Sequence, residues 1–366
     1  MILPDRGIFL PGAKRRAQRK EADPMRAVIT GATGFLGGNL AIELLERGVR
    51  VRCTRRKGSR TDHLASLPIE WVEATLSEPG RLEAAFRDAD VVFHCAARVS
   101  LLRRPTAPIV AANVEGTRNV IEAFRRSGAG RLVHASSVVT CALSEDGRPV
   151  TEAHPWNFDR FGLDDAYSRT KYEGERLVRE AAAHGLDAVI VNPTYMLGPC
   201  DPKPSSGRLI LGVVNGTVPG YTEGMNNFVD VRDVCRGMIA AWEKGKGGER
   251  YILGHENLSY REIMEKIARI AGVPPPRFGI PPLLSTFAGR FGDLFQAATG
   301  QEVGINSVTA RYAHCRRYTF SSEKARRELG YRSGPIETAI HDAIAWFRKR
   351  GMLPRSGRGK VRSTDP

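Results

Sequence analysis

A tyrosine and a lysine four positions apart, Tyr167 and Lys171, are the residues of this chain best suited to proton transfer. The segment around them is typical of a helix, on which positions i and i+4 share a face. An ammonium group there would lower the pKa of the phenol, which starts near 10. Lowering the pKa of the phenol to about 7 requires about 4 kcal/mol, to which a second positive charge nearby would also contribute. Taken alone, such a pair usually belongs to a solvated helix face, but this pair follows the fifth expected strand.

Two serines, Ser136 and Ser137, end the apolar run 132–135. Side chains at the carboxyl end of a buried strand face the ligand in a doubly wound sheet. A hydroxyl group there can hydrogen-bond a carbonyl oxygen while Tyr167 supplies the proton, a contribution of roughly 10²–10⁴ in rate. The alternative is that the serines only cap the strand.

Three glycines, Gly31, Gly34 and Gly37, separate an apolar strand pattern from a helical one. Gly31 would allow the tight turn, Gly34 the approach of a pyrophosphate, and Gly37 the close packing of helix on strand. The helix N-terminus would then face the anion. A plain tight turn is the alternative, but the strand–glycine–helix context favours a dinucleotide site.

The elements that must position these residues alternate between strands and helices. The expected strands are 26–30, 50–54, 69–73, 91–95, 131–135 and 187–191. The expected helices between them are 35–47, 80–87, 109–126 and 166–184. This alternation predicts an α/β fold with a Rossmann-type, doubly wound parallel sheet, whose ligand lies at the carboxyl ends of the strands.

After residue 192 the pattern loosens, and Pro and Gly interrupt residues 193–224. Further helices are expected near 231–243, 259–271, 283–298, 321–329 and 336–350. We therefore expect a dinucleotide-binding domain over 25–192 and a smaller, mostly helical C-terminal substrate lobe over 193–350, with some interleaving.

Phe287, Phe291 and Phe295 recur at helical spacing and give one helix an aromatic face. Core packing or a dimer contact is the first interpretation. A lid over an apolar substrate or a face that touches a membrane surface is the other.

The 366-residue chain has a net charge of +15, which raises the question of a nucleic-acid partner. Residues 1–24 carry +3 and residues 348–366 carry +6, so much of the excess lies in the termini. We expect 1–24 and 351–366 to be basic, disordered extensions, with no specific nucleic acid bound and peripheral membrane contact left open.

No uninterrupted apolar run is long enough to span a bilayer, and no secretory signal pattern begins the chain. Six cysteines are scattered without paired spacing, so neither a disulfide framework nor a metal site is expected. These features predict a cytoplasmic protein.

Taken together, the motifs resemble those of extended short-chain dehydrogenases/reductases, the NAD-dependent epimerase/dehydratase family, over roughly residues 25–350. The subgroup is similar to dihydroflavonol-4-reductase-like and 3β-hydroxysteroid-dehydrogenase-like proteins, near hopanoid-associated sugar epimerase proteins. The motifs that carry this resemblance are Gly31-x-x-Gly34-x-x-Gly37, His94-Cys95-Ala96-Ala97, Asn113-Val114-x-Gly116-Thr117, Ser137, Tyr167-x3-Lys171, Asn192-Pro193, 228–234 and 248–254.

The resemblance implies a catalytic triad of Ser137, Tyr167 and Lys171 and, by family analogy, a homodimer. The cofactor-binding residues expected from the motifs are Gly31, Thr33, Gly34, Phe35, Leu36, Gly37, Arg55, Arg56, Ala96, Ala97, Tyr167, Lys171 and Pro193.

The end of the second strand bears on the choice of cofactor. It reads Thr54-Arg55-Arg56-Lys57, where NAD-binding folds usually place a carboxylate for the ribose 2′-hydroxyl. Arginines suit a 2′-phosphate, so NADP is favoured over NAD, although a solvated basic turn has the same composition.

The leading hypothesis is an NAD(P)-dependent oxidoreductase that reduces a ketone or aldehyde of an apolar small molecule, or oxidises the alcohol. The alternative is a nucleotide-sugar epimerase or dehydratase with tightly bound NAD. Such enzymes place an arginine just before residues 228–230, but residues 224–227 contain no cation, and Arg208 and Arg232 lie elsewhere. A non-catalytic NAD(P)-binding sensor is the third possibility.

Overall fold

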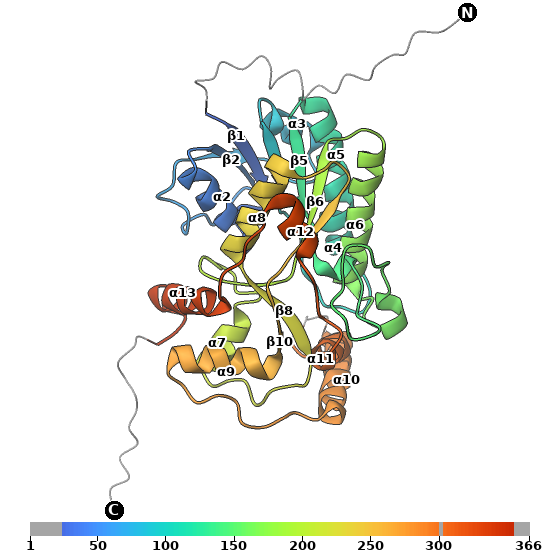
Figure 1. Ribbon diagram of the computed structural model, residues 1–366, viewed down its shortest axis with the longest axis vertical. Helices are drawn as coiled ribbons and strands as arrows, with labels where there is room; N and C mark the ends of the chain where they lie inside the picture. The colour runs from blue at the N-terminus through green and yellow to red at the C-terminus, as the bar shows by residue number, and fades with distance from the viewer. Residues whose placement is uncertain (1–23, 300–302, 355–366) are drawn as a thin grey trace, which may run out of the picture.

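A seven-stranded parallel sheet is the centre of the computed structural model, which describes residues 24–299 and 303–354 (Figure 1). The strand order is β3-β2-β1-β4-β5-β6-β9, and every neighbouring pair is parallel. The strands are β1 (Arg26–Thr30), β2 (Arg50–Arg55), β3 (Ile69–Glu73), β4 (Val91–His94), β5 (Arg131–Ala135), β6 (Ala188–Pro193) and β9 (Arg250–Leu253). The expected Rossmann-type fold is thus confirmed.

Helices cover both faces of this sheet. One layer consists of α2 (Phe35–Glu46), α8 (Val231–Lys244) and α12 (Glu323–Leu329). The opposite layer consists of α3 (Pro79–Phe86), α5 (Gly116–Ser127) and α6 (Ala166–Ala183). Two hydrophobic cores therefore sandwich the sheet, one beneath each layer.

The sequence of β1 explains why the strand is buried on both sides. Ala27 and Ile29 belong to the core beneath α2 and α8, whereas Val28 belongs to the core beneath α3 and α5. Successive side chains of a strand point to opposite faces, so a strand covered on both faces must be apolar throughout.

A second lobe follows the sheet in the lower half of Figure 1. Its three-stranded sheet has the order β10-β8-β7, with β8 antiparallel to β10 and parallel to β7. These strands are β7 (Tyr195–Leu197), β8 (Met225–Asp230) and β10 (Glu256–Ser259). The helices of this lobe are α7 (Arg208–Val214), α9 (Tyr260–Ala271), α10 (Pro282–Thr299), α11 (Ser307–His314) and α13 (Ile336–Lys349).

The second lobe contains β7, β8, β10, α7 and α11, which the sequence pattern did not predict. The main sheet and its helices differ from the expected ones in two places. Residues 250–253, a short strand, add the seventh strand of the main sheet by pairing with β6. The helix expected over 109–126 is divided into α4 (Ala107–Val110), a π-helical turn η1 (Ala111–Glu115) and α5. The expected basic extensions, 1–24 and 351–366, fall almost wholly outside the described residues.

The π-helical turn is a wide turn that presents Asn113 to its neighbours. Its side-chain amide donates to the backbone oxygen of Arg98 and to Thr170 on α6, while its oxygen accepts from the Arg98 backbone N–H. Insertions of this kind are common at functional sites. The turn ties the loop after β4 to α6.

Candidate active site

A cleft of about 290 Å³ lies at the carboxyl ends of the sheet strands and is open to the second lobe. Side chains and backbone from the glycine turn, the ends of β4 to β6, the start of α6 and the segment after β6 line it. The residues named from the sequence that line the cleft are Gly31, Gly34, Phe35, Leu36, Gly37, Cys95, Ala97, Ser136, Ser137, Tyr167, Lys171 and Pro193. Tertiary structure therefore brings most of the predicted site into one place.

The glycine turn after β1 has a steric explanation. Gly31 has φ of +80°, and a Cβ there would lie 2.6 Å from the backbone nitrogen of Ala96. A Cβ on Gly37 would lie 2.5 Å from the Gly31 oxygen, so α2 can approach the turn only without a side chain. The first turn of α2 has neither a side-chain cap nor an acidic residue. This arrangement fits the phosphates of a dinucleotide.

Tyr167 lies in the first turn of α6, where Asp165 is the N-cap. The Asp165 carboxylate accepts hydrogen bonds from the backbone N–H groups of Tyr167 (2.7 Å) and Ser168 (3.1 Å). Tyr312 on α11 donates to the same carboxylate. The beginning of α6, and with it Tyr167, is therefore held from both lobes.

Lys171 is almost fully buried one turn further along α6. Its ammonium donates to the Ala135 oxygen at the end of β5 over 2.8 Å. Burial lowers the pKa of Lys171 to about 8, and the nearby Glu175 carboxylate opposes this shift. A backbone oxygen at the end of β5 therefore fixes the Lys171 ammonium at the wall of the cleft.

The groups of the chain itself shift the pKa of Tyr167 upward, so the expected lowering is left to a bound cofactor and to Lys171. Burial raises the pKa of its phenol above the usual value, and a hydrogen bond with the Ser137 side chain opposes the shift. The contact with Ser137 brings the two predicted catalytic side chains together. The Lys171 ammonium, one turn further along α6, donates to the Ala135 oxygen.

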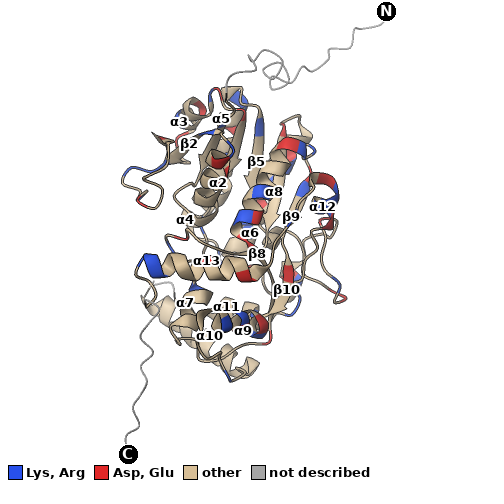
Figure 2. Cartoon of the chain, turned by 60° about the vertical axis from the view of Figure 1, so that its left-hand side comes forward, with Lys and Arg blue, Asp and Glu red and all other residues tan. Residues whose placement is uncertain are grey.

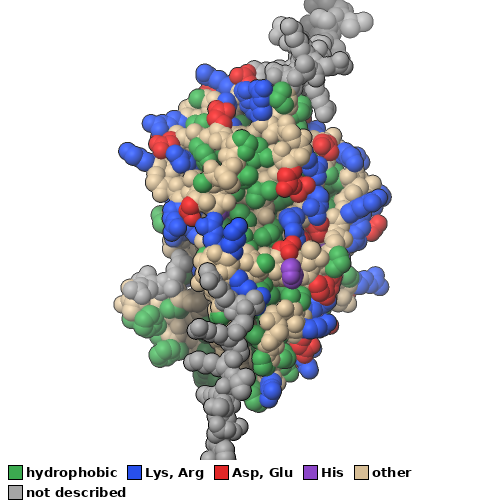
Figure 3. Space-filling view, turned by 90° about the vertical axis from the view of Figure 1, so that its left-hand side faces the viewer, with side chains coloured by type: hydrophobic (Ala, Val, Ile, Leu, Met, Phe, Trp, Pro, Cys, Tyr) green, Lys and Arg blue, Asp and Glu red, His purple; other side chains and the backbone are tan. Residues whose placement is uncertain are grey.

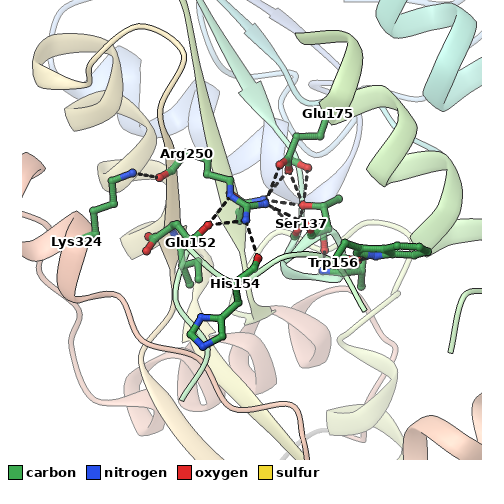
Figure 4. Close-up of polar contacts among 12 residues, drawn as sticks. Ser137, Glu152, His154, Trp156, Glu175, Arg250 and Lys324 are labelled. Carbon is green, nitrogen blue, oxygen red and sulfur yellow. Dashed lines mark hydrogen bonds and ion pairs between the residues drawn. The ribbon is translucent and has the colours of Figure 1, made fainter. Parts of the chain in front are cut away.

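A buried ion pair lies beneath Ser137 (Figure 4). Arg250, the first residue of β9, places its guanidinium 3.2 Å from the Glu175 carboxylate of α6, and only 12% and 2% of these side chains are exposed. Arg250 also donates to the backbone oxygens of Thr140, Glu152 and His154. The arginine thus joins the outermost strand to the loop that follows Ser137.

Polar contacts connect this ion pair to Ser137 itself. The Asn192 amide donates to the Glu175 carboxylate (2.8 Å) and to the Ser137 backbone oxygen (3.1 Å). The Thr140 hydroxyl lies within hydrogen-bonding distance of both acceptors. Through Asn192 and Thr140, Glu175 holds the backbone of Ser137 in place. Its carboxylate also lies near the ammonium of Lys171. Sequence reasoning missed both Glu175 and Arg250.

Four of the expected cofactor-binding residues are not among the lining of this cleft. Thr33 lies within the glycine turn, and Ala96 packs its backbone against Gly31. Arg55 lies 5.8 Å from the Trp71 ring, with Glu73 at 3.9 Å. Arg56 is exposed. A carboxylate does stand beside the end of β2, but it comes from β3 rather than from β2.

The segment after β6 supplies residues that sequence reasoning had named only as part of a substrate loop. Met196, Lys203 and Ser205 line the cleft together with Asp201, which accepts hydrogen bonds from the backbone N–H groups of Ser205 and Gly207. Lys203 brings a cation to the cleft. Charged and small residues in a Pro-rich loop gave no periodic signal that would have singled them out.

Arg232, considered above as a possible ligand for a substrate diphosphate, is occupied by structural contacts. Its guanidinium binds Asp230 through several hydrogen bonds and Asp342 at 2.7 Å. Arg208 is exposed and donates to the Pro204 oxygen. Neither residue is among those lining the cleft.

Two buried histidines, His94 and His134, lie side by side within the sheet, with ring centroids 5.2 Å apart. His94 contacts Thr30 (2.8 Å) and Thr117 (3.2 Å), whereas neither ring nitrogen of His134 has a partner within the structure. Burial lowers the pKa of His94 to about 3 and that of His134 well below its usual value. Both rings are neutral at physiological pH.

The described residues show neither a metal site nor a membrane-spanning helix. Over 24–299 and 303–354, no cluster of three or more His, Cys, Asp or Glu side chains has a geometry that would hold a metal ion. Within the same ranges, no helix combines the length and the hydropathy needed to cross a bilayer.

The model of the NAD dependent epimerase/dehydratase family matches residues 27–254. A Synechocystis protein provisionally named dihydroflavonol 4-reductase is 35% identical over 330 residues, which cover 89% of this chain and 95% of that protein. Sterol demethylase protein B of Methylococcus capsulatus is 34% identical and covers 90% of this chain and 100% of its own length. The crystal structure of gox2253 superposes with a TM-score of 0.79 at 35% identity, over 91% of this chain and 100% of that one.

Proposed function

The chain belongs to the NAD dependent epimerase/dehydratase family and is an NAD(P)-dependent oxidoreductase of the extended short-chain dehydrogenase/reductase type; from that premise we propose that it reduces a ketone or aldehyde of an apolar small molecule, or oxidises the corresponding alcohol. The observation that carries this proposal is the contact of Tyr167 with Ser137 above a buried Lys171, within one cleft.

The proposed mechanism assigns one role to each residue. The glycine turn, Lys171 and Pro193 would hold the phosphates, the ribose and the nicotinamide of a dinucleotide, and this cofactor would supply or accept the hydride. Ser137 hydrogen-bonds the substrate carbonyl oxygen and orients it. Tyr167 transfers its phenolic proton to that oxygen as the negative charge develops. The positive charge of Lys171 and, when an oxidised cofactor is bound, that of its nicotinamide ring would lower the pKa of the Tyr167 phenol, against the effect of burial.

Several observations favour an apolar carbonyl compound over a nucleotide sugar. Arg208 and Arg232 are not among the residues that line the cleft, and Arg232 is bound to two aspartates. Lys203, however, lines the cleft and could bind a diphosphate, which supports the nucleotide-sugar alternative. The relative from Methylococcus capsulatus is named for sterol demethylation, and a sterol is an apolar compound, which supports an apolar substrate here.

NADP is the cofactor we favour, with Arg56 as the main contact for the 2′-phosphate and Arg55 as a second. Arg56 is exposed beside the end of β2, and Arg55 already has Glu73 as a neighbour. Replacement of Arg56 by Gln should raise the Kd for NADPH about tenfold and leave that for NADH unchanged. An equal effect on both cofactors would show that the arginine does not bind the 2′-phosphate.

The function is tested by identifying the nucleotide that the purified protein releases on denaturation. A reductase should release little and should consume NADPH in proportion to an apolar ketone. Tightly held NAD in near-equal amount, with no net cofactor change during turnover, would support the epimerase or dehydratase alternative instead. Binding of cofactor without turnover of either substrate class would support a sensor.

We also propose that the enzyme forms a homodimer, by analogy with its family, and that it is located in the cytoplasm. Pairing of two copies through helices that flank the parallel sheet is tested by sedimentation of the purified chain. A cytoplasmic location is tested by fractionation of cells that produce it.

A further inference from the structure

The helix α10 leaves nearly all of its apolar side chains outside the protein. Between 46% and 72% of each of six large side chains is exposed: Leu283, Leu284, Phe287, Phe291, Leu294 and Phe295. Phe278 and Ile305, on either side of the helix in sequence, are also exposed. The core-packing interpretation of the aromatic spacing is therefore wrong. An apolar surface of this kind marks a site of interaction.

The attachment of α10 to the protein explains why this face stays outside. Its buried residues are Gly289 and Gly292, and a Cβ at these positions would lie 2.8 Å from the Asn306 oxygen and 1.9 Å from the Ile305 oxygen. Glycines thus let the helix rest against the start of α11. The lid interpretation has no support either, because no residue of α10 lines the cleft.

The charged residues next to α10 in the sequence are mostly positive. Among the described residues from 272 to 314, Asp293 is the one acidic side chain, and its carboxylate accepts a hydrogen bond from the Ser307 backbone. Arg277 and Arg290 are exposed beside the apolar side chains. Figure 2 shows the contrast with α9 and α13, along which both signs of charge are marked.

The loop after β4 extends this surface towards the cleft. Asn306, on which α10 rests, donates to the Leu101 oxygen over 3.0 Å. The loop holds Arg103 and Arg104, both exposed, and Val99, which is 57% exposed and lines the cleft. Apolar and cationic side chains therefore continue from α10 to the mouth of the cleft.

We propose that the apolar face of α10, with the arginines beside it and in the loop 98–104, docks on the surface of an anionic lipid bilayer. Apolar side chains enter the interfacial region while the guanidinium groups meet lipid phosphates. A second copy of this chain fits less well, since pairing would bring two positive rims together. Hydrophobic side chains exposed at the lower left of Figure 3 lie in this lobe.

The proposal goes beyond the assigned reaction and does not depend on the substrate. It places the cleft mouth near the membrane, because the loop 98–104 belongs to both surfaces. An apolar compound dissolved in the bilayer would then have a short path to the site.

The test is co-sedimentation of the full chain with vesicles of phosphatidylcholine alone and with about 30% phosphatidylglycerol added. The wild type should bind the anionic vesicles at least about tenfold more strongly, and salt should weaken the binding. F287E/F291E should reduce binding about tenfold or more, and F287S/F291S should also reduce it. The matched control, A84E/A183E, adds the same charge to exposed positions on α3 and α6 and should bind nearly as the wild type.

Three results would overturn the proposal. Equal loss in A84E/A183E would mean that only net charge matters. Full binding by both phenylalanine variants would place the attraction elsewhere, such as in the basic termini. A stable dimer that F287E/F291E dissociates, without vesicle binding by the wild type, would identify a second copy as the occupant.

Discussion

The cleft and the face of α10 use opposite kinds of residues in opposite environments. Around the cleft, charged and polar groups are buried and each is held by partners: Lys171 by Ala135, Asp165 by two N–H groups, Glu175 by Arg250. On α10, large apolar groups are exposed. The exposed apolar face is unfavourable in water and points to an interaction with something outside the chain, whereas the buried polar groups of the cleft have their partners within it.

The comparison separates two ways in which a fold carries function. A buried polar network holds a few atoms in fixed positions, although its burial costs free energy. Single substitutions in it should therefore have large effects on stability and on kcat. An exposed apolar face contributes little to folding, so changes there should alter association only. The predictions that follow test this difference.

The largest effect should come from Tyr167→Phe, which removes the proposed proton donor. We expect kcat to fall about 10²–10⁴-fold, because the ring stays in place while the hydroxyl is lost. The Kd for NADPH should stay within about twofold. Tyr172→Phe is the control on the same helix, since Tyr172 stacks on Trp156. Turnover that survives in the Tyr167 variant would refute the assigned role.

Glu175→Gln should be the next most damaging change. The amide keeps the shape but leaves the Arg250 guanidinium without its buried counter-charge, at a cost of about 3 kcal/mol in the free energy of unfolding. As a positioning residue, Glu175 should also affect kcat more than cofactor binding, whereas a purely structural role would leave kcat of the folded fraction unchanged. Glu175→Asp should restore part of kcat.

A surface ion pair offers the comparison for that experiment. Glu265→Gln breaks the exposed contact with Arg261 (2.8 Å) and should change stability by less than about 0.5 kcal/mol. Chemical denaturation of both variants measures the difference. Equal losses would mean that burial of the Glu175 pair has no special importance.

Acid should destabilise the sheet through its two histidines. The folded pKa of His94 is about 3, below the usual 6.5 of an unfolded chain, so the unfolded state takes up protons first as pH falls below 6.5. Between pH 7.5 and 5 we expect a loss of about 2 kcal/mol for His94, and a further loss from His134.

Denaturation curves at the two pH values test this linkage. His134→Leu removes a ring whose nitrogens have no partner and should reduce the acid-induced loss. The exposed His341→Leu should leave it unchanged. An unchanged loss in the His134 variant would show that other groups cause the acid sensitivity.

The smallest effect on stability should come from the face of α10. Phe291→Ala removes a side chain that is 72% exposed, and we expect the free energy of unfolding to change by less than about 0.5 kcal/mol. Phe158→Ala, at a fully buried position, should cost about 3–5 kcal/mol. A large loss from the Phe291 change would mean that the face is covered within the folded chain.

Sequence alone determined the features that depend on neighbours along the chain. The i and i+4 spacing placed Tyr167 and Lys171 on one helix, and apolar runs marked β1 to β6, because the periods of helix and strand are local properties. The glycine turn was readable as a motif, and the steric need at Gly37 arises from Gly31, six residues before it. At Gly31, by contrast, a Cβ would meet Ala96 after β4, a contact that only the tertiary structure shows.

Tertiary structure alone decided which distant residues meet. Glu175 and Arg250 form an ion pair although 75 positions separate them in the sequence. The four residues of β9 are too few for a sequence pattern to show that they pair with β6. The spacing of Phe287, Phe291 and Phe295 indicated an apolar face but not whether anything covers it. Burial depends on what packs against a face, and periodicity carries no information about that partner.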